Sequence, residues 1–102
     1  MILISGYLEY RPEERDEVIA GLVEVSKRSR DDPGCLDYWW AEDLETPSRF
    51  RFLECWESEE QFAAHRDQPY EHEFMERYVN NRVTGADALS YAPSSRRSAM
   101  DM

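Results

Sequence analysis

The sequence predicts an α+β fold of the ferredoxin-like type, a β-α-β-β-α-β chain whose single antiparallel sheet carries its helices on one face. Three observations predict it. Four short segments are rich in β-branched, aromatic and other apolar residues. Between them lie two regions whose apolar residues recur with helical spacing. The two middle β-like segments are separated only by a short Glu-Thr-Pro-Ser turn, which makes them a hairpin.

The first strand and the first helix are expected at residues 2–10 and 11–32. Residues 2–10 are β-prone and lack a helix cap. In residues 11–32, Pro12 suits a first helical turn, while acidic residues near the start and basic residues near the end complement the helix dipole. Gly21 is expected to allow close packing, and Asp-Pro-Gly at 32–34 ends the helix. The expected buried stripe consists of Val18, Ile19, Leu22 and Val23, with Ser26 beside it.

The hairpin is expected to pair residues 35–44 with residues 49–57. Pairing around the intervening turn places Cys55 opposite Asp37 or Tyr38 rather than Cys35. The two cysteines are therefore expected to be buried free thiols that act as small hydrophobic residues.

The second helical region begins at Ser58, which has capping-box spacing to Gln61, and runs to about residue 66. Pro69 interrupts it, and residues 70–79 continue as another helical stretch. Its apolar side consists of Tyr70, Phe74, Met75, Tyr78 and Val79. A final strand is expected at residues 82–92, which closes a single domain of residues 1–92. Residues 93–102 are polar and aperiodic, as is typical of a disordered tail.

The charge of the chain restricts its partners. The sequence contains 12 Lys+Arg against 22 Asp+Glu, a net charge of -10. This sign opposes binding to nucleic acid or to an anionic membrane surface, so neither is an expected partner. No segment approaches the roughly 20 apolar residues of a membrane span. The N-terminus lacks the basic region of a secretory signal, so the expected location is the cytoplasm.

Both faces of the hairpin are aromatic, although helices can cover only one of them. In the second strand, Leu36, Tyr38 and Trp40 alternate with Cys35, Trp39 and Ala41. In the third, Phe50, Phe52, Glu54 and Trp56 alternate with Leu53 and Cys55. An uncovered apolar face marks a partner or ligand site. Packing two such sheets face to face predicts a homodimeric α/β barrel with a hydrophobic cavity.

Three stretches, "DPGCLDYWW", "RFRFLECWESEEQFAAH" and "QPYEHEF", resemble the antibiotic biosynthesis monooxygenase family of dimeric α/β barrels. Their order and spacing extend the resemblance over about residues 2–92. Glu-x-Trp-x-Ser followed by a helical histidine is its most specific part. The resemblance implies a small aromatic or quinol-like substrate between sheet and helices. It also implies oxidation by molecular oxygen without a metal, flavin or haem cofactor. Such a pocket needs aromatic walls, a proton acceptor and little water.

The expected wall of this pocket is aromatic. Trp56 is the first candidate, on the strand face that is expected to carry no helices. Phe52 and Trp40 share that face if the hairpin register is correct, whereas a slip of one residue would replace Trp40 by Trp39. The expected substrate-binding set also includes Tyr38, Phe62 and Phe74.

His65 and Glu54 are the candidate catalytic groups. Imidazole ordinarily titrates near a pKa of ~6.5, which suits a proton acceptor for a phenol, and His65 is expected at the pocket rim. A structural hydrogen-bonding role for His65 remains open. Glu54 is either a base with a raised pKa or a structural partner of Arg82 or Arg51. His72 is expected on the surface, and the histidine spacing predicts no metal site.

The sequence also departs from two branches of the family that it resembles. In the branch that oxidises aromatic polyketides, three polar side chains contact the substrate. In this sequence, Phe52, Phe62 and a residue near Met75 stand at the corresponding positions. The axial histidine of the haem-degrading branch also falls near Met75. The expected function is therefore a cofactor-independent monooxygenase of the quinol-oxidising kind. The alternatives are a non-oxidative isomerase of a small metabolite and a non-catalytic binding or stress-related dimer.

Overall fold

The computed structural model describes all 102 residues and contains one four-stranded antiparallel sheet in the order β2-β3-β1-β4. The predicted α+β order is confirmed. Its elements are β1 (Ile2–Glu9), the 3-10 turn η1 (Pro12–Glu14), α1 (Arg15–Arg30), β2 (Cys35–Glu42), β3 (Arg49–Trp56), α2 (Glu59–Arg66), α3 (Pro69–Phe74), the π-helical turn η2 (Met75–Val79), β4 (Gly85–Tyr91) and the 3-10 turn η3 (Ala99–Asp101).

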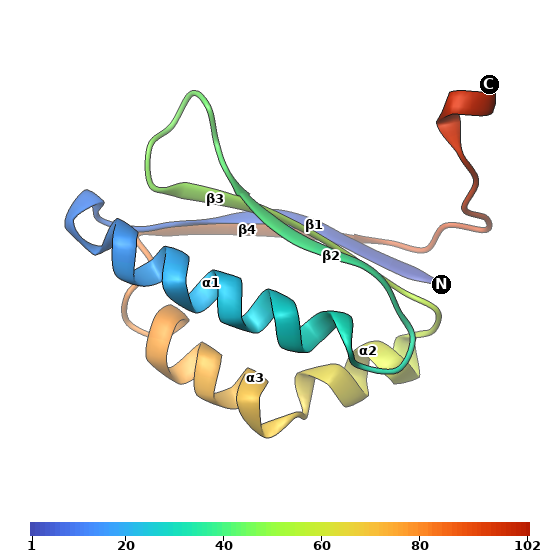
Figure 1. Ribbon diagram of the computed structural model, residues 1–102, viewed down its shortest axis with the longest axis horizontal. Helices are drawn as coiled ribbons and strands as arrows, with labels where there is room; N and C mark the ends of the chain where they lie inside the picture. The colour runs from blue at the N-terminus through green and yellow to red at the C-terminus, as the bar shows by residue number, and fades with distance from the viewer.

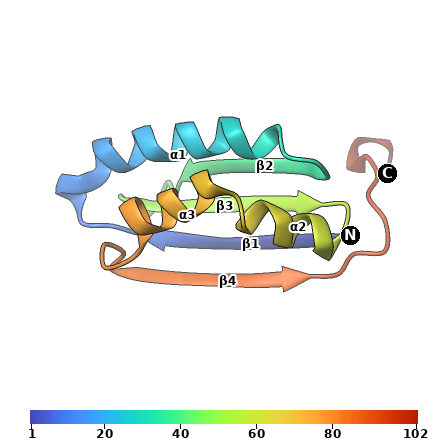
Figure 2. The same ribbon diagram turned by 90° about the horizontal axis from the view of Figure 1, so that it is seen from below.

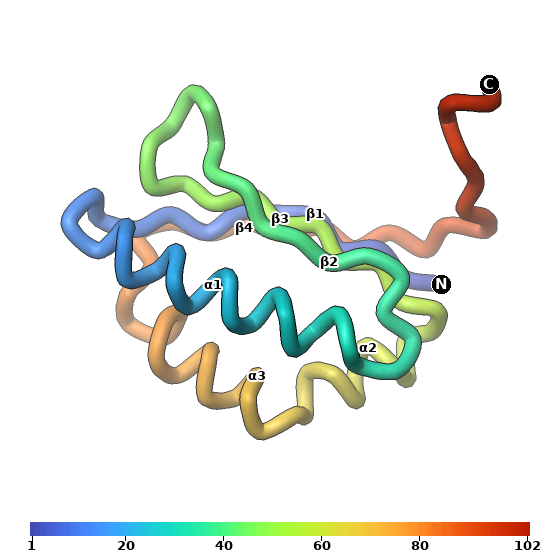
Figure 3. Tube along the Cα trace, in the orientation of Figure 1, coloured from blue at the N-terminus to red at the C-terminus, as the bar shows by residue number.

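All three α-helices lie on one face of the sheet (Figure 1). Seen from the helical side, α1 runs along β2, whereas α2 and α3 lie over β3 and β1 and leave β4 at the margin (Figure 2). The Cα trace shows the chain beyond β4 departing on the side of the sheet opposite the helices (Figure 3). Because one sheet face and most of β4 are uncovered, only 16 of the 102 residues are buried.

Helix α1 buries a stripe that differs by one side chain from the predicted one. Val18 and Leu22 are buried as expected, but the next core residue is Val25, while Val23 is 49% exposed. Val25 continues the three-to-four-residue spacing from Leu22, which Val23 does not. Gly21 allows the predicted close packing, because a Cβ atom there would lie 2.5 Å from the ring of Tyr78.

The hairpin register is the predicted one, with Trp40 opposite Phe52 and Asp37 opposite Cys55. One detail is wrong. A bulge between Cys35 and Asp37 shifts Cys35 opposite Trp56, so its side chain packs on the Tyr38 and Trp56 side rather than with Trp39. Both thiols are free, with Cys55 buried and Cys35 half-buried.

The second helical region begins and breaks where the sequence indicates. The Ser58 hydroxyl accepts the backbone N–H of Gln61 at 3.1 Å and caps α2. Pro69 starts α3 as a separate helix. Phe74 is buried in the main core, and its predicted companions Tyr70, Met75, Tyr78 and Val79 pack around that core.

The helix-covered face is the one that carries Trp40, Phe52 and Trp56, so the expectation that Trp56 lies on the helix-free face is wrong. Trp56 packs directly on Phe62 and His65 of α2. The uncovered face instead carries a cross-strand row made by Trp39, Leu53, Ser5 and Leu89. The largest exposed side chains on it are Trp39, Leu89 and Tyr91.

Two further features complete the description. The segment after β4 is exposed and contains η3, and its Arg96 guanidinium donates to the Leu36 carbonyl at 3.4 Å. The disorder expected of residues 93–102 and the domain boundary at residue 92 remain predictions. None of the helices is long and apolar enough to cross a membrane.

Candidate functional site

A cavity of about 180 Å³ lies between the sheet and the helices. Most of its lining is apolar and comes from all four strands and from α2, α3 and η2. The lining residues are Ile4, Leu8, Tyr38, Trp40, Phe52, Glu54, Phe62, His65, Arg66, Glu71, Phe74, Met75, Val79 and Ala88. Ala88 belongs to β4, which no helix covers, and is itself exposed, so the cavity opens toward the β4 edge.

The aromatic wall forms because hairpin partners point to the same side of the sheet. The rings of Trp40 and Phe52 lie 4.7 Å apart between centroids, and Phe74 of α3 approaches Trp40 at 6.4 Å. Tyr38 lies two residues before Trp40, and its hydroxyl accepts the Trp40 indole N–H at 3.1 Å. With Phe62, these residues bring together every predicted substrate-binding side chain except Trp56.

Trp56 supports the site from behind rather than lining it. It is fully buried, and its indole stacks on the His65 imidazole with centroids 4.5 Å apart. Its ring N–H donates to Glu54 Oε1 at 2.9 Å. Trp56 therefore fixes two cavity groups at once, the imidazole by stacking and the carboxylate by a hydrogen bond.

His65 is buried, 2% exposed, which corrects its expected position at the rim. Its Nδ1 lies 2.9 Å from Asp32 Oδ2 and 3.1 Å from the Tyr70 hydroxyl. Tyr70 also donates to Asp32 Oδ2 at 2.5 Å. Because an ionised carboxylate only accepts, it favours the tautomer whose Nδ1–H points at Asp32. Nε2 is then the nitrogen left for the cavity.

Two glutamates face this second nitrogen. Glu54 Oε1 lies 3.9 Å from His65 Nε2, and Glu71 Oε2 lies 3.7 Å from it. Burial raises the pKa of Glu54, a shift that the Trp56 hydrogen bond and the charges of His65 and Arg66 oppose. Burial likewise raises the pKa of Glu71. The cavity thus holds two carboxyl groups that release their protons less readily than exposed glutamates do.

The arginine partners expected for Glu54 are engaged elsewhere. Arg82 pairs with Glu14 and Glu17 near the start of α1, at 2.9 and 3.0 Å. Arg51 points to the outer side of the hairpin and pairs with Asp43 at 2.7 Å. The structural partner of Glu54 is instead the indole of Trp56, which lies two residues further along the same strand face.

The sequence reasoning did not identify Asp32, Tyr70 or Glu71 as site residues. Asp32 was interpreted only as part of a helix stop, and the break at Pro69 hides the relation of Tyr70 and Glu71 to His65. The available signal was Glu71, an acidic residue that follows the Pro69 break and lies six positions after the candidate histidine His65. His72 is exposed, as predicted, and lies 3.7 Å from the exposed Asp67.

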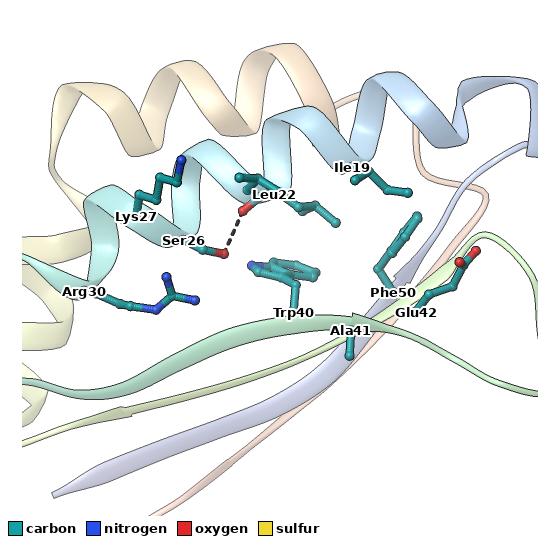
Figure 4. Close-up of a pocket in the computed structure, with 10 residues that line it drawn as sticks. Ile19, Leu22, Ser26, Lys27, Arg30, Trp40, Ala41, Glu42 and Phe50 are labelled. Carbon is teal, nitrogen blue, oxygen red and sulfur yellow. Dashed lines mark hydrogen bonds between the residues drawn. The ribbon is translucent and has the colours of Figure 1, made fainter.

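A second, larger hollow of about 300 Å³ lies between α1 and the edge strand β2. Figure 4 shows Trp40 beneath α1 there, with the Ser26 hydroxyl bonded to the Leu22 carbonyl. Two more of its polar groups are engaged, since Arg30 donates to the Tyr38 carbonyl and Glu42 pairs with Arg15, and the remaining one, Lys27, is exposed. The smaller cavity, which brings two largely buried carboxyl groups and a buried imidazole together with aromatic walls, is therefore the candidate active site.

Comparison with known proteins places the chain in a family. The sequence profile described as antibiotic biosynthesis monooxygenase matches residues 1–77. An uncharacterized protein of Synechocystis, sll1783, is 33% identical over 76 residues, which are 74% of this chain and 52% of that protein. The chain therefore aligns with about half the length of this curated relative.

Solved structures share the fold. A candidate antibiotic biosynthesis monooxygenase of Deinococcus radiodurans superposes with a TM-score of 0.84 at 24% identity, covering 96% of this chain and 97% of that one. Rv0793 of Mycobacterium tuberculosis gives a TM-score of 0.84 at 20% identity, covering 95% and 98%. At these identities the likeness concerns the arrangement of sheet and helices.

Proposed function

The chain belongs to the antibiotic biosynthesis monooxygenase family, and from that premise we propose that it oxidises a small aromatic or quinol-type molecule with molecular oxygen. The substrate supplies the electrons, so the reaction needs no metal or organic cofactor, and it takes place in the cytoplasm. The observation that carries this proposal is the cavity itself, whose aromatic walls surround one buried group of acid–base side chains.

The proposed reaction balances without a further reactant. A side chain of the cavity takes a hydroxyl proton, and the electron-rich phenolate passes one electron to oxygen. Recombination of the resulting radical pair forms a carbon–oxygen bond and a peroxide. Loss of the ring proton and cleavage of the O–O bond then leave a carbonyl and release water. A hydroquinone and one O2 thereby give a hydroxyquinone and one water.

His65 is the proposed proton acceptor. Its Nδ1–H points at Asp32, so the lone pair on Nε2 faces the cavity. Once protonated, the imidazolium lies beside Asp32 and within 4 Å of Glu54 and Glu71 oxygens, which stabilises the added charge. Trp56 holds the ring in this orientation by stacking. The remaining aromatic walls keep water away from the phenolate.

The test is oxygen consumption with a panel of hydroquinones and catechols in metal-depleted buffer. For a substrate that is turned over, His65→Ala should lower the rate by roughly 100- to 10,000-fold, the usual contribution of a positioned proton acceptor. His72→Ala is the matched control, because that histidine is exposed and outside the cavity. Ligand binding without any oxygen consumption would refute oxidation and favour the non-oxidative alternative.

We further propose that the protein is a homodimer joined through the helix-free sheet face. The row of Trp39, Leu53, Ser5 and Leu89 exposes apolar area that a second copy would cover. Sedimentation should give a dimer at micromolar concentration, and Leu89→Asp, which adds a charge within the row, should shift it toward monomer. A folded wild-type monomer at that concentration would contradict the proposal.

A further inference from the structure

One acceptor in the cavity has no partner. Glu71 Oε2 is buried, lines the cavity wall and receives no hydrogen bond from the protein. His65 Nε2, which carries the lone pair in the tautomer assigned above, lies 3.7 Å away and offers this oxygen no hydrogen bond. A buried carboxylate oxygen without a donor is costly, so the site is built for a proton or for a donor carried by a ligand.

Glu54 offers a second acceptor close by. Its Oε1 takes the Trp56 indole N–H, which leaves Oε2 without a protein donor. Glu54 Oε1 and Glu71 Oε2 both lie within 4 Å of the same nitrogen, His65 Nε2, although they come from β3 and α3. The two carboxyl groups therefore flank one imidazole nitrogen in a largely apolar cavity, and each keeps one oxygen without a protein donor.

We propose that Glu71 is a specificity-determining residue that, together with Glu54, selects a neutral single-ring ligand bearing two adjacent hydroxyl groups, as in a catechol. This inference rests on the proposed function for the position of the ligand, but not for its oxidation. Each hydroxyl donates to one carboxyl oxygen, while the ring lies between the Trp40–Phe52 wall and Phe62.

The volume sets the number of rings. A closed apolar cavity of about 150 Å³ accommodates benzene. The cavity of about 180 Å³ here therefore suits one ring with small substituents. A ligand of three or four fused rings would extend out of the cavity at its opening toward the β4 edge.

The charged side chains around the cavity determine which ligand charge it can accept. Glu54, Glu71, His65 and Arg66 face the cavity, with Asp32 and the hydroxyls of Tyr38 and Tyr70 behind or beside them. Arg66 is itself exposed, and its guanidinium lies 5.7 Å from the Phe62 ring centroid. A ligand carboxylate at the inner end would meet two carboxyl groups, and like charges at that distance repel strongly in a buried site.

The experiment measures binding without oxygen, so that no turnover is required. Trp40 lines the cavity, and intrinsic tryptophan fluorescence under anaerobic conditions therefore reports occupancy. The probes are catechol, hydroquinone, 1,2-dimethoxybenzene and benzoate at one fixed neutral pH. Catechol should bind about 10-fold or more tightly than dimethoxybenzene, since each donor meets a charged acceptor, and more tightly than hydroquinone. Benzoate should not bind.

Glu71→Gln preserves size and removes the charged acceptor. It should weaken catechol binding about 10-fold and reduce the preference for catechol over dimethoxybenzene. Glu76→Gln, an exposed position on the following helical turn, is the matched control and should bind as the wild type does. Thermal melts of both variants verify that they fold.

Equal affinity of the wild type for catechol and dimethoxybenzene would overturn the inference, and that comparison requires no variant. Equal affinity for catechol and hydroquinone would overturn the adjacent-hydroxyl assignment. An unchanged preference in Glu71→Gln would remove Glu71 from the role proposed for it. The proposed oxidation fails separately: a protein that ranks the probes as expected yet consumes no oxygen would keep this inference and lose that function.

Discussion

Asp32→Asn is the substitution that most directly tests how His65 is held. Asp32 Oδ2 accepts from both His65 Nδ1–H and the Tyr70 hydroxyl, at 2.9 and 2.5 Å, and its side chain is only 11% exposed. Asparagine keeps the shape but replaces a charged double acceptor by a neutral amide, half of which is a donor. Both hydrogen bonds therefore lose their charged acceptor and are weakened, or they meet the amide nitrogen instead.

The expected loss of stability follows from that change. A hydrogen bond to a charged group contributes roughly 1.5–3 kcal/mol, and a neutral one about 1 kcal/mol. Weakening two such bonds, with His65 and Tyr70 still in contact, predicts a loss of about 2 kcal/mol in the free energy of unfolding. For a domain of about 100 residues this lowers the melting temperature by roughly 10 °C.

The assay is thermal unfolding followed by circular dichroism, at one protein concentration because dimerisation would couple to stability. Asp31→Asn is the matched control, since Asp31 is adjacent in sequence and exposed. Exposed substitutions of this kind usually stay within about 0.5 kcal/mol of the parent. If Asp32→Asn has the same melting temperature as Asp31→Asn, the Asp32–His65–Tyr70 network does not fix the imidazole. The assignment of His65 Nε2 to the cavity would then be wrong as well.

Two further predictions concern stability. Because the pKa of Glu71 is raised in the folded state, its carboxyl binds a proton more readily there than in the unfolded chain, and stability is lost as the pH rises through that folded-state pKa. Glu71→Gln should therefore melt higher than the wild type at pH 8, and this advantage should disappear as the pH falls toward the ordinary glutamate pKa of about 4.3. Removal of residues 93–102 should leave the melting temperature nearly unchanged, because that segment is exposed; a large drop would mean that the tail contacts a partner subunit.

The elements and their pairing were predictable because local chemistry specifies them. The turn before Arg49 and the strict alternation of Phe50, Phe52 and Glu54 fix the hairpin register, since a slip of one residue would reverse every side chain. Similarly, the Ser58 cap marks the start of α2 and Pro69 marks the start of α3.

The covered face and the site contacts were less predictable. Alternation separates two faces of a strand but does not say which one meets the helices, and here aromatic residues occupy both. The partner of Glu54 was missed for a related reason. A search for opposite charges favours arginines, whereas the available donor was the neutral indole of Trp56 on the same strand face. The bulge at Cys35 likewise depends on tertiary pairing rather than on local sequence.

The break at Pro69 is what assembles the polar end of the cavity. In one continuous helix, residues five and six positions beyond His65 would lie about 140° and 240° around the axis from it. Tyr70 and Glu71 could not both reach the imidazole from there. Because α3 starts anew at Pro69, its first turn brings the Tyr70 hydroxyl to Nδ1 and a Glu71 oxygen to within 4 Å of Nε2. The same proline that ends a helical pattern in the sequence therefore positions both sides of the candidate proton acceptor.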